Sequence, residues 1–378
     1  MTRDAAAAIR AQALEVAAGW SPPDAPPSWR LTAALLRVIA GHDQLLGRLA
    51  SLPPDRLPAL LASAAITYLV RRDQAAPLVD YFPRPGREVV QPEFDDRFCS
   101  AAEVFCSGRL DDIAAVCGRR RYQMNEVARC AQIALGVAAV AAPDEPVALA
   151  DLGTGAGLGL HLDRYRYQVG GRSAGPSGAP LTLHCAARGP LVPPPAALPP
   201  IAERAGLDLH PVDVTDPAAR AWLEACAPPE ATALARLTAA IDVTRRHPVP
   251  LLAGDVLDLL PVVLDRFPPG RPVIVTDAYL AVFQSGPQRE QLTRILARAA
   301  RTRPVTWLSL DPLVPLGPAG RESVQGLPLP PALVRDYQQH GVFAVLSART
   351  FGDGADQARL LARAHPSGQW IEWLDRRS

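Results

Sequence analysis

Lysine is absent from this sequence of 378 residues, because all 39 residues counted as lysine plus arginine are arginine. A phosphate-binding loop of the Gly-Lys-Ser/Thr kind, a protein-kinase fold and a Schiff base of the pyridoxal or aldolase type each need a lysine amine. The sequence therefore excludes these three kinds of enzyme. Asparagine is nearly absent as well, and Asn125 is its single occurrence.

Further absences limit the partners. The 39 basic and 38 acidic side chains leave a net charge of +1, whereas contact with nucleic acid or an anionic membrane needs a sustained basic face. The six cysteines form no Cys-x-x-Cys pair, so no metal site is expected. The most apolar run, residues 127–142, is shorter than the ~20 residues of a membrane-spanning helix. Because Met1–Trp20 lacks the apolar core of a signal peptide, we expect a cytoplasmic protein without nucleic-acid or membrane partners; its oligomeric state stays open.

The first part of the chain has a helical pattern. The length allows about two domains. Up to residue 142, apolar residues recur at three- and four-residue spacing, as in residues 31–50 and 126–141, and proline pairs such as Pro53-Pro54 separate the segments. We therefore expect residues 1–142 to form a helical N-terminal lobe.

The pattern changes after Pro143, where short apolar runs alternate with helical segments. This alternation is typical of a mostly parallel sheet with helices on both faces, so residues 143–378 are predicted to form a Rossmann-like α/β domain. The seven expected strands are residues 147–152, 205–209, 249–253, 273–276, 305–310, 342–348 and 369–374. Residues 350–368 are expected to be less regular.

An insertion of about residues 163–200 follows the first strand and helix. Within it, residues 165–169 and 181–185 flank a turn rich in glycine, serine and proline. Alternating side chains on both sides of such a turn predict a β-hairpin. A stiff, proline-dense connection over residues 190–200 follows it.

A glycine-rich turn follows the first predicted strand and reads Asp151-Leu-Gly-Thr-Gly-Ala-Gly157. Glycines let a backbone turn sharply and approach a ligand closely, and the helix start behind them offers free amide donors. Dinucleotide enzymes need the spacing Gly-x-Gly-x-x-Gly, but leucine stands at the third glycine position whether one counts from Gly153 or Gly155. The spacing therefore disfavours a nicotinamide cofactor. A tight turn without a ligand is the alternative.

The remaining pattern, acidic-x-Gly-x-Gly-x-Gly, resembles motif one of the class I S-adenosylmethionine-dependent methyltransferases. The resemblance implies that the turn lies along the methionine and ribose parts of S-adenosylmethionine and that Asp151 helps to hold its amino group. It also implies a ribose contact for Asp208, which closes the second core strand, and an adenine contact for Asp255 after the third. The implied cofactor-binding residues are Asp151, Gly153, Thr154, Gly155, Gly157, Asp208, Asp255 and Asn125. For the two later acids, a solvated carboxylate or a helix cap is the alternative.

The whole chain also resembles an uncharacterised bacterial family, domain of unknown function 2332. Four segments carry the resemblance: residues 119–129, 163–167, 206–216 and 361–374. The first of them starts the helix before the first strand, and its Gln123, Asn125 and Glu126 are candidates to hydrogen-bond the methionine end of the cofactor or an acceptor. In class I methyltransferases the corresponding helix closes over the cofactor. A solvated helix start with an amide cap is the alternative.

Together these patterns predict binding of S-adenosylmethionine and methyl transfer to a small molecule. The sulfonium supplies the electrophile, so the protein mainly aligns the acceptor and excludes water. If the acceptor must lose a proton, the candidate catalytic bases are Asp277 after the fourth strand and Glu126. The alternative is a non-catalytic protein that keeps the fold as a nucleoside sensor or scaffold.

Overall fold

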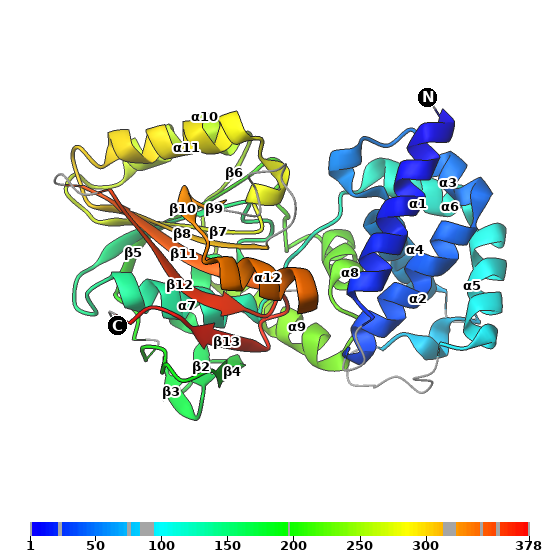
Figure 1. Ribbon diagram of the computed structural model, residues 1–378, viewed down its shortest axis with the longest axis horizontal. Helices are drawn as coiled ribbons and strands as arrows, with labels where there is room; N and C mark the ends of the chain where they lie inside the picture. The colour runs from blue at the N-terminus through cyan, green and yellow to red at the C-terminus, as the bar shows by residue number, and fades with distance from the viewer. Residues whose placement is uncertain are drawn as a thin grey trace. The chain divides into compact units, whose positions relative to one another are not determined.

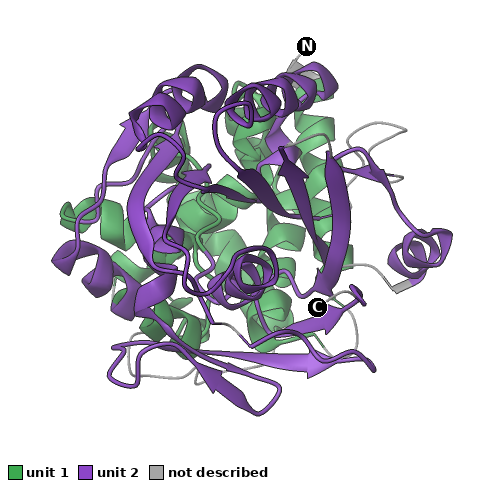
Figure 2. Ribbon diagram, turned by 90° about the vertical axis from the view of Figure 1, so that its left-hand side faces the viewer, with its two compact units in different colours: residues 1–125, 215–238 green, residues 126–214, 239–378 purple. Residues whose placement is uncertain are grey.

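The computed structural model of the chain describes residues 2–21, 25–73, 77–83, 94–195, 197–312, 323–340, 343–352 and 356–376. The chain divides into two compact units, coloured separately in Figure 2. Unit 1 comprises residues 1–125 and 215–238, and unit 2 comprises residues 126–214 and 239–378. The sequence pattern placed a boundary at residue 142. In the structure, helix α7 (Arg129–Val140) belongs to unit 2 and helix α8 (Pro217–Cys226) to unit 1.

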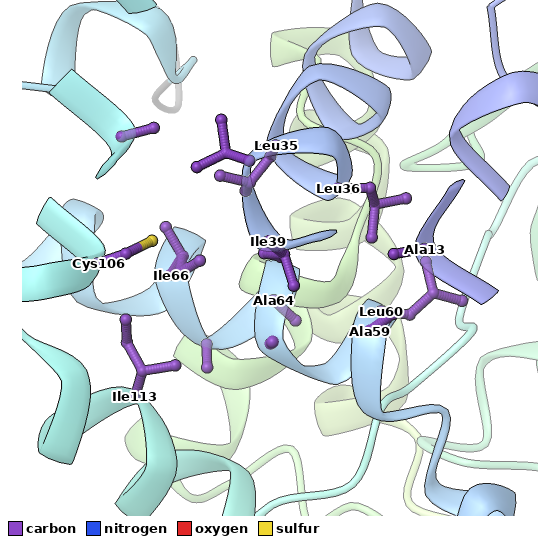
Figure 3. Close-up of a cluster of buried hydrophobic side chains, with 14 of the residues drawn as sticks. Ala13, Leu35, Leu36, Ile39, Ala59, Leu60, Ala64, Ile66, Cys106 and Ile113 are labelled. Carbon is purple, nitrogen blue, oxygen red and sulfur yellow. The ribbon is translucent and has the colours of Figure 1, made fainter. Parts of the chain in front are cut away.

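Unit 1 is helical and has one apolar core. Its helices are α1 (Thr2–Gly19), α2 (Pro27–Gly41), α3 (Asp43–Leu49), α4 (Pro58–Arg72), α5 (Asp96–Gly108), α6 (Leu110–Arg119), α8 and the first half of α9 (Ala231–Arg246), with short 3-10 turns η1 (Pro54–Arg56) and η2 (Val79–Tyr81). Leu35 and Ile39 of α2 pack with Ile66 of α4 (Figure 3). Proline begins α2 and α4, where the missing N–H would be unpaired in any case.

The cysteines behave as small apolar residues. All six are free thiols, and five of them are buried. Burial raises the pKa of Cys106 and Cys117 to about 12, so both stay protonated. Among the described residues, no group of three or more histidine, cysteine, aspartate or glutamate side chains is arranged to hold a metal ion.

Unit 2 is built on one sheet of eleven strands, not the seven that the pattern predicts. Their order across the sheet is β3-β2-β4-β13-β12-β11-β8-β7-β1-β5-β6. The strands are β1 (Val147–Leu152), β2 (Arg166–Val169), β3 (Arg172–Ala174), β4 (Thr182–Arg188), β5 (Ile201–Asp208), β6 (Leu251–Ala253), β7 (Val273–Ala278), β8 (Val305–Pro312), β11 (Ala344–Phe351), β12 (Gln357–Ala364) and β13 (Trp370–Trp373). Strand β12 lies where we expected an irregular segment. A separate pair joins β9 (Ser323–Val324) and β10 (Leu327–Pro328).

The predicted hairpin between residues 165–169 and 181–185 is wrong. Strand β2 pairs antiparallel with β3, across a two-residue turn at Gly170 and Gly171 with φ of 54° and 80°. Such a turn matches the twist of the strands and favours glycine. Strand β4 then pairs parallel with β2 and with β13, so the insertion extends the main sheet.

Helices cover both faces of this sheet (Figure 1). Helices α10 (Val256–Arg266) and α11 (Gly286–Ala299) pack on one face, against alternate residues of β1, β7 and β8 such as Val275 and Trp307. Helix α7 packs on the other face, where a Cβ on Gly136 would lie 3.3 Å from Leu308 and Leu346. The remaining elements are α12 (Pro331–His340), η3 (Leu158–Arg164) and η4 (Ala281–Phe283).

Five neighbouring strands, in the order β6-β5-β1-β7-β8, are mutually parallel. The chain runs from β1 outward through β5 and β6, and then returns to the opposite side of β1 through β7 and β8. The direction therefore reverses between β1 and β7. In open α/β sheets, ligands bind outside the carboxyl ends of the strands at such a point. No helix among the described residues is both long and apolar enough to cross a membrane.

Candidate functional site

The glycine turn follows β1 directly, at the carboxyl edge of the parallel strands. Gly153, Gly155 and Gly157 have positive φ angles of 68°, 56° and 72°, a conformation that residues with a Cβ disfavour. The N–H groups of Gly153 and Thr154 donate to the carbonyl of Leu207 in β5, at 2.8 and 3.2 Å. Gly153 is exposed, whereas Gly155 and Gly157 are buried. Of these three glycines, only Gly153 therefore has an exposed backbone.

Asp208 ends β5, and its carboxylate faces the turn. Oδ2 accepts a hydrogen bond from Gly155 N at 2.9 Å, and Oδ1 accepts one from His210 N at 2.8 Å. A carboxylate has about four acceptor positions, so further donors can still bind to it. The next residue, Leu209, is large and apolar but 58% exposed. The end of β5 thus presents an anionic acceptor followed by an exposed apolar side chain.

Asp151, in β1 just before the glycine turn, makes a hydrogen bond within the protein. Its Oδ1 accepts a hydrogen bond from Thr276 Oγ1 at 2.7 Å, and a Cβ on Gly159 would come within 3.3 Å of its Oδ2. Burial raises the pKa of Asp151 to about 6, although the hydroxyls of Thr276 and Thr154 partly offset this effect. Burial therefore disfavours the charge of Asp151, and the hydroxyl of Thr276 already occupies one of its oxygens.

Asp277, a predicted catalytic base, is buried in a pair of carboxyl groups that the sequence analysis did not identify. It is 1% exposed and accepts hydrogen bonds from Trp307 Nε1 at 2.5 Å and Ser309 Oγ at 3.2 Å. Ser309 Oγ also contacts Asp311 Oδ2, and Asp311 Oδ1 accepts from Ala281 N at 3.2 Å. Burial raises the pKa of Asp277 well above its ordinary value, and the charge of Asp311 adds to the rise. Burial also raises the pKa of Asp311, to about 6.

The other predicted site residues make local hydrogen bonds. Asp255 caps α10, because its Oδ1 accepts from Leu257 N at 2.8 Å. Glu126, the second candidate base, accepts from Ala128 N at 3.0 Å ahead of α7. Asn125 Nδ2 donates to Gln123 Oε1 at 3.1 Å. Asn125 is the last residue of the first segment of unit 1, whereas the other predicted site residues belong to unit 2.

Two further side chains of unit 2 have unusual environments. Tyr279 follows β7 with a φ of +68°, which is rare for a bulky residue and occurs mostly at functional or strained positions. Its buried hydroxyl has no hydrogen-bond partner among the described residues. His161 of η3 is fully buried, and neither ring nitrogen has a hydrogen-bond partner in the described part of the chain. A periodic sequence pattern does not reveal unpartnered polar atoms or a positive φ angle. Asp311, in contrast, could have been found from the sequence, because it directly follows the predicted strand 305–310.

The site thus combines two parts along one edge of the sheet. The first is an exposed turn glycine beside Asp208 and Leu209, and the second is the buried pair of Asp277 and Asp311. A Cβ on Gly153 would lie 3.4 Å from Leu280, so the segment after β7 lies against the glycine turn. This arrangement can bind a polar group with two donors at Asp208 and can hold a proton at the buried pair.

One protein-family model, described as an uncharacterized protein conserved in bacteria (DUF2332), matches residues 6–373. No curated protein matches the chain, and no solved structure matches it.

Proposed function

Since the chain belongs to this DUF2332 family, whose description assigns no activity, we propose from the geometry of unit 2 that the protein binds S-adenosylmethionine and transfers its methyl group to a small molecule. The orientation of Asp208 carries the proposal. Its carboxylate, at the end of β5, lies against the glycine turn that ends β1. Two neighbouring hydroxyls, such as those of a ribose, suit an acceptor-only group with positions left for two donors.

Three further observations support the proposal. The five parallel strands have the order of a Rossmann-like sheet, and the turn lies at their reversal point. The exposed backbone of Gly153 permits close approach of a ligand. The exposed Leu209 beside Asp208 offers an apolar face for a flat base. Bound S-adenosylmethionine would supply the electrophilic methyl group, while Gly153, Asp208 and Leu209 would hold its adenosyl part.

A thermal-shift measurement tests the proposal. At a ligand concentration of about 100 Kd the stabilisation is about 2.7 kcal/mol, which corresponds to a rise in Tm of about 5–10 °C for a unit of this size. We expect this rise with S-adenosylmethionine or its demethylated product, but not with NAD. Asp208→Asn keeps one acceptor oxygen, which can serve the amide of Gly155 or that of His210 but not both, and it should lose most of the rise.

A second experiment distinguishes catalysis from binding. The protein is incubated with labelled S-adenosylmethionine and a cell extract, which supplies the methyl acceptor. Labelled product supports methyl transfer. A Tm rise without labelled product would favour a non-catalytic binding protein. Asp216→Asn, which alters a carboxylate that caps α8, is the matched control and should leave both measurements unchanged. No Tm rise with the wild-type protein would refute the proposal.

A further inference from the structure

We infer that Asp277, Ser309, Asp311 and Tyr279 form a proton-accepting site, in which Asp311 takes the proton that a hydroxyl or amine substrate loses. Asp277 and Ser309 are positioning residues in this site. The inference rests on the proposed function, because the substrate is the methyl acceptor. The sequence pattern suggested Asp277 as the base that contacts the substrate, whereas the inference assigns this contact to Asp311.

The hydrogen bonds indicate that the two carboxyl groups share one proton. Ser309 Oγ lies within hydrogen-bond distance of both Asp277 Oδ1 and Asp311 Oδ2, but a hydroxyl has only one proton to donate. One of the two contacts therefore needs a proton on a carboxyl group. Asp277 is the more enclosed of the pair, at 1% exposure against 6% for Asp311. Two buried carboxyl groups that both contact one hydroxyl group do not both ionise readily.

Tyr279 points to a ligand beside this pair. Its hydroxyl is buried and unpartnered within the described residues, which costs about 1–3 kcal/mol when no hydrogen bond compensates. Burial raises the pKa of Tyr279 to about 12, the charge of Arg129 opposes this rise, and the charge of Asp311 adds to it. Tyr279 N donates to the carbonyl of Leu310 at 2.9 Å, and Ala281 N donates to Asp311. The strained segment after β7 is thereby fixed around Asp311.

Charged groups from several elements surround the pair. The charge of Asp151 in β1 adds to the rise in the pKa of Asp277, and the charge of Arg289 in α11 opposes the rise in the pKa of Asp311. The Arg129 guanidinium stacks on the Tyr279 ring, 4.0 Å from its centre, and Tyr337 of α12 also interacts with Tyr279. The charge of Asp151 thus opposes ionisation of Asp277, whereas the charge of Arg289 favours ionisation of Asp311. This asymmetry favours the ionised form at Asp311.

The site fits a substrate group that donates to Asp311 and accepts from Tyr279, as a hydroxyl or an amine does. In the step we infer, the substrate oxygen or nitrogen forms a bond to the methyl carbon while the carbon–sulfur bond breaks. The electron pair of that bond returns to sulfur, which becomes a neutral thioether. The substrate proton passes to Asp311, and the pair then holds two protons until one leaves to water. General-base catalysis of this kind typically contributes a factor of about 10²–10⁴ in rate.

The first test measures the pair directly, in the full-length protein labelled with ¹³C at aspartate carboxyl groups. We expect two coupled titrations, both displaced upward from the ordinary pKa of an aspartate carboxyl group, and Asp311→Asn should change both. Glu290→Gln, at an exposed glutamate of α11 paired with Arg294, should change neither. Independent titration of Asp277 and Asp311 would overturn the shared proton.

The second test compares labelled product formed from labelled S-adenosylmethionine and cell extract. Asp311→Asn should lower it at least about 100-fold while the Tm rise with S-adenosylmethionine is retained, and Glu290→Gln should have no effect. Asp277→Asn should shift the pH at which product formation falls, since it acts through Asp311. Unchanged product formation in Asp311→Asn would overturn the catalytic role.

The two proposals fail differently. If the wild-type protein shows neither a Tm rise nor labelled product, the proposed function fails, and the methyl-transfer role of Asp311 fails with it. The ¹³C titration still decides in that case whether the pair holds a shared proton.

Discussion

The fully buried His161 should make unit 2 sensitive to acid. His161 is fully buried, and burial, with the charges of Arg204 and Arg164, lowers its pKa from 6.5 to about 4. In the unfolded chain the ring takes up a proton below about pH 6.5, whereas in the folded protein it stays neutral until about pH 4. Its contribution to stability is therefore complete above pH 6.5 and is lost as the pH falls toward 4.

We predict that His161→Leu removes the loss of stability that His161 causes at acid pH. Between pH 7 and pH 5, the variant should gain about 2 kcal/mol in free energy of unfolding relative to the wild type. Asp151 and Asp311, whose raised pKa values act in the opposite direction, are present in both proteins and cancel in this difference. Urea unfolding at the two pH values measures it, and His184→Gln, at an exposed position, is the control. A difference between His161→Leu and wild type that does not change with pH would contradict the assignment.

At the scale of elements, the contact between β5 and the glycine turn depends on Gly206. A Cβ on Gly206 would lie 2.6 Å from Thr154 Cγ2 and 2.7 Å from Leu251 Cδ2, closer than side-chain carbons pack. Gly206→Ala should therefore displace the turn, cost about 1–3 kcal/mol in stability and weaken the Tm rise with S-adenosylmethionine. Thermal shifts with and without the ligand measure both effects.

Gly178→Ala is the matched control, because a Cβ there meets nothing within 4 Å. It should leave both Tm values unchanged. Gly206→Ala/Thr154→Gly removes the side chain of the closest contact and should restore part of the stability. A Gly206→Ala protein as stable as the wild type would show that the turn is not held by this packing.

The elements differ in how well the sequence predicts them. Strand β1 was predicted at its observed bounds, since it is a short apolar run ended by glycine. Strand β12 was missed because its sequence, Gln-Ala-Arg-Leu-Leu-Ala-Arg-Ala, is poor in residues that favour strands. It is a strand through pairing with β11 and β13, and partners distant in sequence leave no local signal. The pairing of β4 with β13 was missed for the same reason.

The candidate site shows the same division. The resemblance to methyltransferases, rather than spacing, pointed to Asp208, and its ligand contact stays a prediction. The spacing itself predicted the glycine turn, which the structure has directly after β1. It did not show that Asp277 is enclosed by Trp307 and Ser309, because this depends on the register between β7 and β8. The positive φ of Tyr279 has no sequence signal either, since tertiary contacts impose it on a residue that disfavours it.

At the scale of the whole molecule, unit 1 is built from two separate segments of the chain. Helix α8, from the second segment, packs into the core made by the first. The Trp222 ring meets Tyr68 edge-on, with ring centres 5.8 Å apart, and its Nε1 donates to the carbonyl of Arg121 at 2.8 Å. The carbonyl of Glu224 accepts from Arg71 Nη1 at 2.5 Å. Removing the first segment therefore deprives α8 of these partners.

We predict that a chain beginning at residue 126 exposes the apolar side of α8 and associates in a concentration-dependent way. Fluorescence of a hydrophobic dye and sedimentation measure the two effects. Trp222→Gln together with Cys226→Ser should reduce both in the shortened chain, because these side chains belong to the core of unit 1. In the full-length protein the same pair should instead destabilise unit 1, by about 3–5 kcal/mol from the tryptophan alone. A shortened chain that stays monomeric and binds no dye would show that α8 does not need the first segment, and the two-segment division would be wrong.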